Sequence, residues 1–351
     1  CRKARVDSGM RLNRRNAVSS GLLLSGILAF STLRCSEGKL GTSGDDGGAR
    51  IDAAKDGALG DSAIAPPGDG SVPVDANIDA NTVDPISGIA AVQRIMNGFG
   101  FVEGPLWRAA TSDLLFNDIP ANITKKLVLP ATFTDFRTGS QGANGMALDP
   151  AKKLVVCEGG GRRVSRENGA GGFDLVIDKW QGTNLNSPND VIVRSDGTIY
   201  FTDPSYGGTK QLAFEGVFRV DPAGNPTLVA MGLTRPNGIA LSPDEKTLYV
   251  ADEPAGKIVK FPVNNDGSTG TVSDFVLTPN PDGITVDDDG NVYSASKNGV
   301  DVFRSSGTKI GTIPVPEQPA NVAFGGADRK RLFITARTGL YSVQVNVAGP
   351  P

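Results

Sequence analysis

Short runs of apolar residues alternate with polar turn residues along most of the chain after residue 90, a pattern typical of β-strands. Residues 237–241 and 247–252 are two such runs, and Pro243-Asp244 separates them as a turn signal. We therefore expect two short strands joined by a tight turn. Similar pairs of runs recur at residues 144–158, 189–203 and 282–295, and weaker copies start at Glu103 and Asn321.

Each copy begins with an oxygen-bearing residue, and the six starts are Glu103, Asn144, Asn189, Asn237, Asp282 and Asn321. Successive starts are 39 to 48 residues apart, which is the spacing of propeller blades. Six copies predict an all-β, six-bladed β-propeller with four-stranded blades over residues 91–348. Because equivalent positions of every blade lie at the same height around the central channel, we expect these six side chains to converge on one axis.

The two ends of the repeat region are expected to close the ring. Residues 92–96 form a candidate first strand, and residues 339–345 alternate apolar and polar side chains as a last strand would. Pairing the two strands would complete the last blade and leave no open sheet edge.

Residues 1–39 are predicted to be an export segment. They are rich in Lys and Arg, and the apolar run at residues 17–30 has the length of a signal-peptide core and is short for a membrane span. Met10 is a candidate true start. Cys35 stands where a lipid-anchored cysteine would, although Arg34 departs from that motif. The segment predicts export to a bacterial cell envelope, the periplasm or the medium, with a lipoprotein membrane tether as one alternative.

Residues 40–90 change composition abruptly to Asp, Gly, Ala, Ser and Pro and contain no aromatic residue. Such a stretch cannot bury enough apolar area to offset the entropy lost on ordering. We predict a disordered linker between the export segment and the propeller.

Net charge and residue composition exclude several classes of partner and catalytic site. The chain has 351 residues, a net charge of −3 and no long basic run in the repeat region, so nothing favours a nucleic-acid partner. It has no histidine, which excludes Ser-His-Asp and Cys-His nucleophile pairs and imidazole metal sites. Cys157, the one cysteine of the repeat region, is predicted to be a small core residue. No signal for oligomerisation stands out, and we expect a monomer.

The repeat starts combine two carboxylates with four amides. Calcium prefers six to eight oxygen ligands of these kinds, so convergence on one axis would create a cation site. The alternative is structural, because Asn-Gly and Asp-Gly are also common turn dipeptides. Asp196-Gly197 and Asp289-Gly290 are expected to be such turns between strands.

Four motifs in order resemble the SMP-30/gluconolactonase family, which includes regucalcin and Drp35-type lactonases. They are Glu103-Gly104-Pro105-Leu106-Trp107, Ser187-Pro188-Asn189-Asp190, Pro236-Asn237-Gly238-Ile239-Ala240 and Pro281-Asp282-Gly283-Ile284. The segments at residues 157–164 and 201–207 are similar to the bacterial gluconolactonases in particular. The resemblance covers roughly residues 95–345 and implies a six-bladed propeller.

The resemblance also implies one divalent cation on the channel axis, calcium first, with zinc or magnesium as alternatives. Its implied ligands are Glu103, Asn189, Asn237 and Asp282. Asp282 is in addition the implied general base. Implied contacts to substrate are Asn144 and Asp190, followed by Glu158, Arg163 and Tyr206.

The expected reaction is metal-assisted hydrolysis of sugar lactones, with Asp282 or the ion activating the attacking water. One departure bears on substrate preference, because Gly159 stands where related sequences often have His. Two alternatives remain open: hydrolysis of organophosphates or other esters at the same site, and a non-catalytic propeller that binds ligands.

Overall fold

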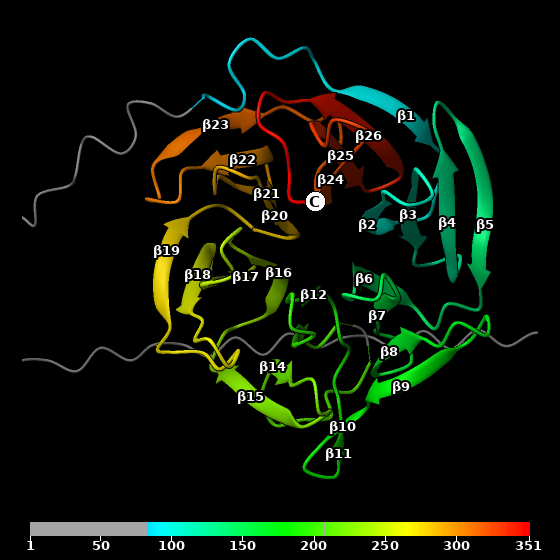
Figure 1. The fold of residues 1–351 in the computed structure, drawn as a ribbon, viewed down its shortest axis with the longest axis vertical. Coiled ribbons are helices and arrows are strands. Elements are labelled where there is room, and N and C mark those ends of the chain that lie inside the picture. The colour runs from blue at the N-terminus through cyan, green and yellow to red at the C-terminus, as the bar shows by residue number, and fades with distance from the viewer. Residues whose placement is uncertain (1–82, 207) are drawn as a thin grey trace, which may run out of the picture. The chain divides into compact units, whose positions relative to one another are not determined.

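The computed structural model describes residues 83–206 and 208–351. They form six four-stranded antiparallel sheets arranged in a ring, with one additional short ribbon (Figure 1). These residues contain no helix, and so none that is long and apolar enough to span a membrane. The prediction of an all-β, six-bladed propeller with four-stranded blades is confirmed. The predicted export segment, including Met10 and Cys35, lies outside the described residues.

The first three blades follow one another along the chain, each with its first strand innermost in the ring (Figure 1). Blade 1 contains β2 (Val102–Arg108), β3 (Asp113–Asp118), β4 (Ile123–Val128) and β5 (Thr132–Thr138). Blade 2 contains β6 (Ala143–Leu148), β7 (Leu154–Glu158), β8 (Arg163–Glu167) and β9 (Phe173–Ile177). Blade 3 contains β12 (Val191–Val193), β13 (Ile199–Asp203), β14 (Gly216–Val220) and β15 (Pro226–Met231). The ribbon of β10 (Lys179–Trp180) and β11 (Thr183–Asn184) connects blades 2 and 3.

The second half of the ring repeats the pattern. Blade 4 contains β16 (Pro236–Leu241), β17 (Thr247–Asp252), β18 (Lys257–Pro262) and β19 (Ser273–Leu277). Blade 5 contains β20 (Ile284–Val286), β21 (Val292–Ser296), β22 (Gly299–Phe303) and β23 (Lys309–Ile313). Blade 6 contains β24 (Pro319–Gly325), β25 (Arg331–Ala336) and β26 (Gly339–Gln344) from the end of the chain. The expected turns at Asp196-Gly197 and Asp289-Gly290 connect the first and second strands of blades 3 and 5.

The fourth strand of blade 6 comes from the other end of the repeat region. β1 (Gln93–Asn97) pairs antiparallel with β26, so that Gln93 lies opposite Ser342 and Asn97 opposite Gly339. The predicted closure of the ring is therefore confirmed. Because the last sheet joins both ends of the propeller, its hydrogen bonds hold the ring shut.

The hydrophobic core is divided among the six blade interfaces. Each of the six buried apolar clusters draws side chains from two adjacent blades, and the cluster between blades 6 and 1 completes the circuit. Cys157 is fully buried in the cluster between blades 2 and 3, as predicted for a core residue. Burial raises the pKa of its thiol, which makes this cysteine a poor nucleophile.

The end of the predicted linker packs onto the propeller. Ile86 and Ile89 contact the core cluster between blades 5 and 6, and Pro85 is buried. The main-chain N–H of Asn346 donates to the Pro85 carbonyl at 2.9 Å. Residues 85–89 of the predicted linker therefore contact the propeller, because two isolated isoleucines find an apolar surface that the local composition does not reveal.

Candidate active site

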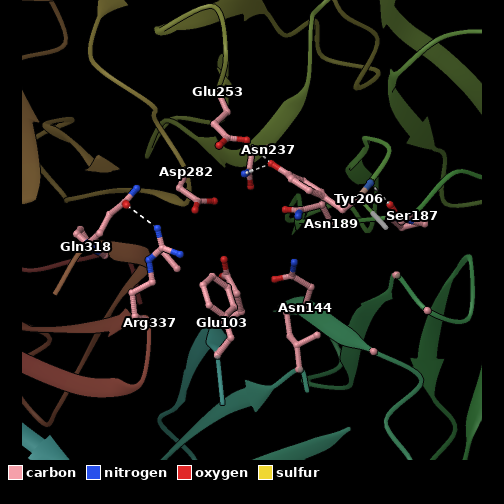
Figure 2. A pocket seen from close by; sticks show the side chains of 18 of the residues that line it. Glu103, Asn144, Ser187, Asn189, Tyr206, Asn237, Glu253, Asp282, Gln318 and Arg337 are labelled. Atoms are coloured by element: carbon pink, nitrogen blue, oxygen red, sulfur yellow. Dashed lines mark hydrogen bonds between the residues drawn. The ribbon is translucent and has the colours of Figure 1, made fainter. Parts of the chain in front are cut away.

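A cavity of about 510 Å³ lies at the end of the ring where the innermost strands begin. Five of the six repeat starts line it, each from a different blade, and so does one tyrosine: Glu103, Asn144, Asn189, Asn237, Asp282 and Tyr206. Figure 2 shows the five repeat-start side chains pointing toward a common point. The expected convergence on one axis is therefore found for these five positions.

In three blades a bulge lies at the start of the innermost strand, beside the residue that faces the cavity. In blades 1, 2 and 4 the pairing register shifts between Glu103 and Leu106, between Ala143 and Met146, and between Pro236 and Ile239. A bulge leaves residues out of the regular ladder and re-aims their side chains. In these three blades the polar residue at the start of the copy is thereby freed from the alternation of the strand.

In four of the six copies a glycine follows the polar residue and lies at the contact between blades. A Cβ on Gly104 would overlap the main-chain oxygen of Asn144, and one on Gly238 would overlap that of Asp282. Only glycine allows neighbouring inner strands to approach so closely. These Asn-Gly, Asp-Gly and Glu-Gly pairs are therefore not hairpin turns, unlike the pairs that end the innermost strands of blades 3 and 5.

The two carboxylates experience different environments. Glu103 is buried, with 4% of its surface exposed, and burial raises the pKa of its carboxyl to about 8. A hydrogen bond from the Gly104 N–H at 3.0 Å opposes that shift, and the charge of Asp190 adds to it. Asp282 is partly exposed to the cavity, and its pKa is raised first by burial and next by the negative charges of Glu103 and Glu253. Two buried carboxyls that repel each other favour either a proton or a cation between them.

The amides supply further oxygen atoms. The Oδ1 atom of Asn144 is buried and has no hydrogen-bond partner among the described residues. Its main-chain oxygen accepts from Asn117 Nδ2 at 2.6 Å, which fixes the strand beneath it. A buried carbonyl oxygen without a partner is costly unless a ligand, an ion or water completes it. The Oδ1 atom of Asn144 is thus available to accept a hydrogen bond or to bind a cation in the cavity.

The donor set fits a hard divalent cation. The described residues contain no cluster of three His, Cys, Asp or Glu side chains arranged to hold a metal ion. The cavity instead combines two carboxylates with amide oxygens, and these are the ligands that calcium accepts. Glu103, Asn189, Asn237 and Asp282, the four implied ligands, all line the same cavity.

Tyr206 links two blades across the cavity wall. It follows β13 in blade 3, and its hydroxyl donates to Glu253 Oε2 at 2.5 Å. The same hydroxyl accepts from Asn237 Nδ2 at 2.8 Å, as the dashed line in Figure 2 marks. Arg235 Nη1 lies 3.6 Å from Glu253 Oε2, so the carboxylate has a cation on its outer side.

Comparison with known proteins identifies the family. Residues 101–338 match the SMP-30/Gluconolactonase/LRE-like region. The chain belongs to this family. The resemblance drawn from four short motifs is therefore confirmed over about two-thirds of the chain.

Relatives of the SMP-30/gluconolactonase family match most of the propeller. The gluconolactonase of Zymomonas mobilis is 31% identical over 310 residues, which covers 79% of this chain and 85% of the relative. The solved structure of a gluconolactonase from Xanthomonas campestris superposes with a TM-score of 0.70 at 33% identity, covering 75% of this chain and 91% of the other. Regucalcin from Agrobacterium tumefaciens, described as a calcium-binding protein, has a TM-score of 0.64 at 19% identity, covering 74% and 95% of the two chains. The last likeness shows the fold alone.

Three residues that the family resemblance implied as substrate contacts do not line the cavity. The Asp190 carboxylate accepts from the N–H groups of Val191 at 2.9 Å and Ile239 at 3.2 Å, and burial raises its pKa to about 7. Glu158 is fully buried beside Arg163.

Glu158 is the centre of an ion-pair cluster in blade 2. It accepts from Arg137 at 2.9 Å, from Arg163 at 2.5 Å and from Ser165 at 2.6 Å. These contacts satisfy the carboxylate within the protein. The next residue, Gly159, does line the cavity.

The sixth repeat start, Asn321, does not line the cavity. Its Oδ1 atom accepts from the Val322 N–H at 2.8 Å, and it occupies the space that a Cβ on Gly283 would need. Like that of Asp190, its side chain lies in the contact between neighbouring inner strands.

The sequence did not single out Glu253, Gln318 or Arg337, although all three line the cavity. They lie in loops between strands, outside the repeated polar-Gly motif. For Glu253 and Arg337, the position within the blade repeat could have predicted a place near the cavity. Glu253 and Arg337 directly follow the second strands of blades 4 and 6, at the end of the ring where the innermost strands begin.

Proposed function

We propose that the protein hydrolyses sugar lactones in this cavity with the help of one divalent cation, calcium first. Family membership and the gluconolactonases of Zymomonas and Xanthomonas support the broader statement that the chain is a lactonase. The observation that carries the finer proposal is the set of oxygen donors gathered at one end of the ring. A propeller that only binds ligands does not require two mutually repelling buried carboxyls there.

The cation would be held by Glu103, Asn189, Asn237 and Asp282. These side chains offer only oxygen, and the absence of histidine from the sequence disfavours the imidazole sites typical of zinc. Two carboxylates match the charge of one divalent ion. When bound, the ion would supply Lewis-acid polarisation of the ester carbonyl. We infer calcium from the oxygen donors of the cavity and not from the structural similarity to regucalcin.

Asp282 is the better candidate for the general base. Glu103 is almost completely enclosed, whereas Asp282 is partly exposed to the cavity and can reach a water molecule there. Asp282 would take the proton of the attacking water and return it to the alcohol oxygen that leaves as the ring opens.

Asn144 would orient the substrate. Its buried, unpartnered Oδ1 can accept a hydrogen bond from a ring hydroxyl, and satisfying it would offset the cost of its burial. A sugar lactone carries several such hydroxyls. Correct orientation of the ester relative to the attacking water contributes to the rate because it removes the entropic cost of their encounter.

The test is hydrolysis of glucono-δ-lactone by the full chain, followed as acid release before chelation, after EDTA and after calcium is restored. We expect activity to disappear with EDTA and to return with calcium. Activity that survives removal of all bound metal would overturn the cation's role. If the protein binds one ion per chain but does not open the lactone, the substrate is wrong, and esters and phosphotriesters become the next substrates.

A further inference from the structure

We infer that Tyr206 and Glu253 are positioning residues that hold the Asn237 side chain with its amide oxygen toward the cation, and so set the protein's affinity for it. The inference rests on the proposed cation site and adds to it the residues that make one amide a ligand. An amide offers an oxygen on one side and an NH₂ group on the other, and only the oxygen can bind a cation.

The phenol hydroxyl of Tyr206 decides which side faces the cavity. It has one proton, and it donates that proton to Glu253 Oε2 at 2.5 Å. The Glu253 oxygen is the acceptor of this hydrogen bond. The hydroxyl then has only lone pairs left for Asn237, and the atom 2.8 Å away must be the donor Nδ2. The Oδ1 atom of Asn237 consequently points to the opposite side.

The surroundings of Glu253 keep this direction in place. Arg235 Nη1 lies 3.6 Å from Glu253 Oε2, and the Arg235 guanidinium sits over the Tyr206 ring at 5.2 Å from its centroid. The guanidinium thus lies beside both the carboxylate and the phenol ring and limits the movement of the two side chains. The chain of contacts therefore runs from Arg235 through Glu253 and Tyr206 to Asn237, each link defining the next.

The main chain of Asn237 is held independently. Its carbonyl oxygen accepts from Thr202 Oγ1 at 2.6 Å, so the strand does not move with the side chain. The remaining freedom is the rotation of the amide itself. Without the Tyr206 hydroxyl, the Asn237 amide loses the acceptor that fixes the position of its Nδ2 atom, which Figure 2 marks with a dashed line. A bound cation would then have to select one orientation of the Asn237 amide, and the protein's affinity for the cation would fall accordingly.

The experiment measures calcium binding by the full chain with isothermal titration of calcium chloride into metal-free protein. Tyr206→Phe removes the hydroxyl without changing any charge. Glu253→Asp keeps the charge but withdraws the carboxylate from the phenol by one methylene. We expect Tyr206→Phe to weaken calcium binding about 10- to 100-fold, the usual effect of losing a group that orients a metal ligand. Glu253→Asp should weaken it in the same direction.

Tyr293→Phe is the matched control. Tyr293 is buried in blade 5, and its hydroxyl donates to Asp287 Oδ2 at 3.0 Å, a tyrosine-carboxylate pair that does not line the cavity. We expect its calcium affinity to equal that of the wild type. The double variant Tyr206→Phe/Glu253→Asp should bind no more weakly than Tyr206→Phe, because both changes act through Asn237.

Three results would overturn the inference about Tyr206 and Glu253. Wild-type calcium affinity in both Tyr206→Phe and Glu253→Asp would overturn the inference while leaving the cation site intact. Equal losses in Tyr206→Phe and Tyr293→Phe would also overturn it, because the effect would then be one of general stability. If the wild type itself binds no calcium, the proposed cation site fails, and the inference fails with it.

Discussion

Gly238→Ala tests whether the close contact between inner strands positions the active site. Gly238 follows the cavity residue Asn237, and it packs against the start of blade 5, where Asp282 lies. An added Cβ would overlap the main-chain oxygen of Asp282 and lie 2.7 Å from Gly283 Cα and 2.8 Å from Ile284 N. The substitution therefore pushes on the segment that carries the proposed base without touching a polar side chain.

The size of the effect follows from these distances. Ordinary contacts of a Cβ begin at 3.4 Å, so the segment around Asp282 has to move by on the order of 1 Å. A misplacement of that size costs about 100-fold in rate. The same overlap is expected to lower the free energy of unfolding by about 1–3 kcal/mol. Because domains are typically stable by about 5–15 kcal/mol, the variant should remain folded.

The assay compares kcat/KM for lactone hydrolysis in Gly238→Ala and in Gly270→Ala. Gly270 is in the same blade, and its added Cβ would meet only the Pro262 side chain, at 3.4–3.6 Å. The control should keep wild-type activity, whereas Gly238→Ala should lose about two orders of magnitude while its melting curve stays cooperative. A folded Gly238→Ala with wild-type kcat/KM would refute the argument that this contact positions Asp282.

Three further predictions concern the cavity residues. Asp282→Asn is expected to lower kcat by about 10²- to 10⁴-fold with the fold retained, and wild-type turnover at saturating lactone would contradict its role as base. Burial raises the pKa of Glu103 to about 8 and also raises that of Asp282, so the metal-free protein loses stability as the pH rises from the ordinary carboxyl range toward 8. Calcium should remove that loss and raise Tm more at pH 8 than at pH 5; equal shifts at both pH values would contradict the pairing of these carboxyls with the ion. Arg337 lines the cavity and donates to Gln318 Oε1 at 2.7 Å, with no acidic partner among the described residues. Arg337→Ala should therefore raise KM about 10-fold more for a lactone bearing a carboxylate than for neutral glucono-δ-lactone, and equal changes would exclude such a contact.

The sequence was sufficient for the architecture because blade repeats and ring closure are properties of strand order. The alternation of apolar residues in each copy reappears as the inner strands, and residues 92–96 and 339–345 pair as expected. The contacts of Ile86 and Ile89 within the predicted linker could not be foreseen, since these residues find their apolar partners only on the assembled blades. The export segment and its cysteine remain predictions.

The sequence also identified five of the oxygen-bearing residues that meet at the cavity. It could not decide which repeat starts face the cavity and which stabilise the ring. Asn321 has the same place in the repeat as Asn237, yet its amide oxygen binds a neighbouring main-chain N–H. Asp190 follows Asn189 directly and does the same.

What the sequence determined by itself was the number of blades, the closure of the ring and the exclusion of histidine chemistry, because each depends only on residue type and spacing. What only the tertiary structure decided was the direction of individual side chains. That direction depends on hydrogen-bond partners supplied by the adjacent blade, as Tyr206 of blade 3 does for Asn237 of blade 4. Residues 49 positions apart, such as Asp190 and Ile239, become neighbours only when blades 3 and 4 pack together.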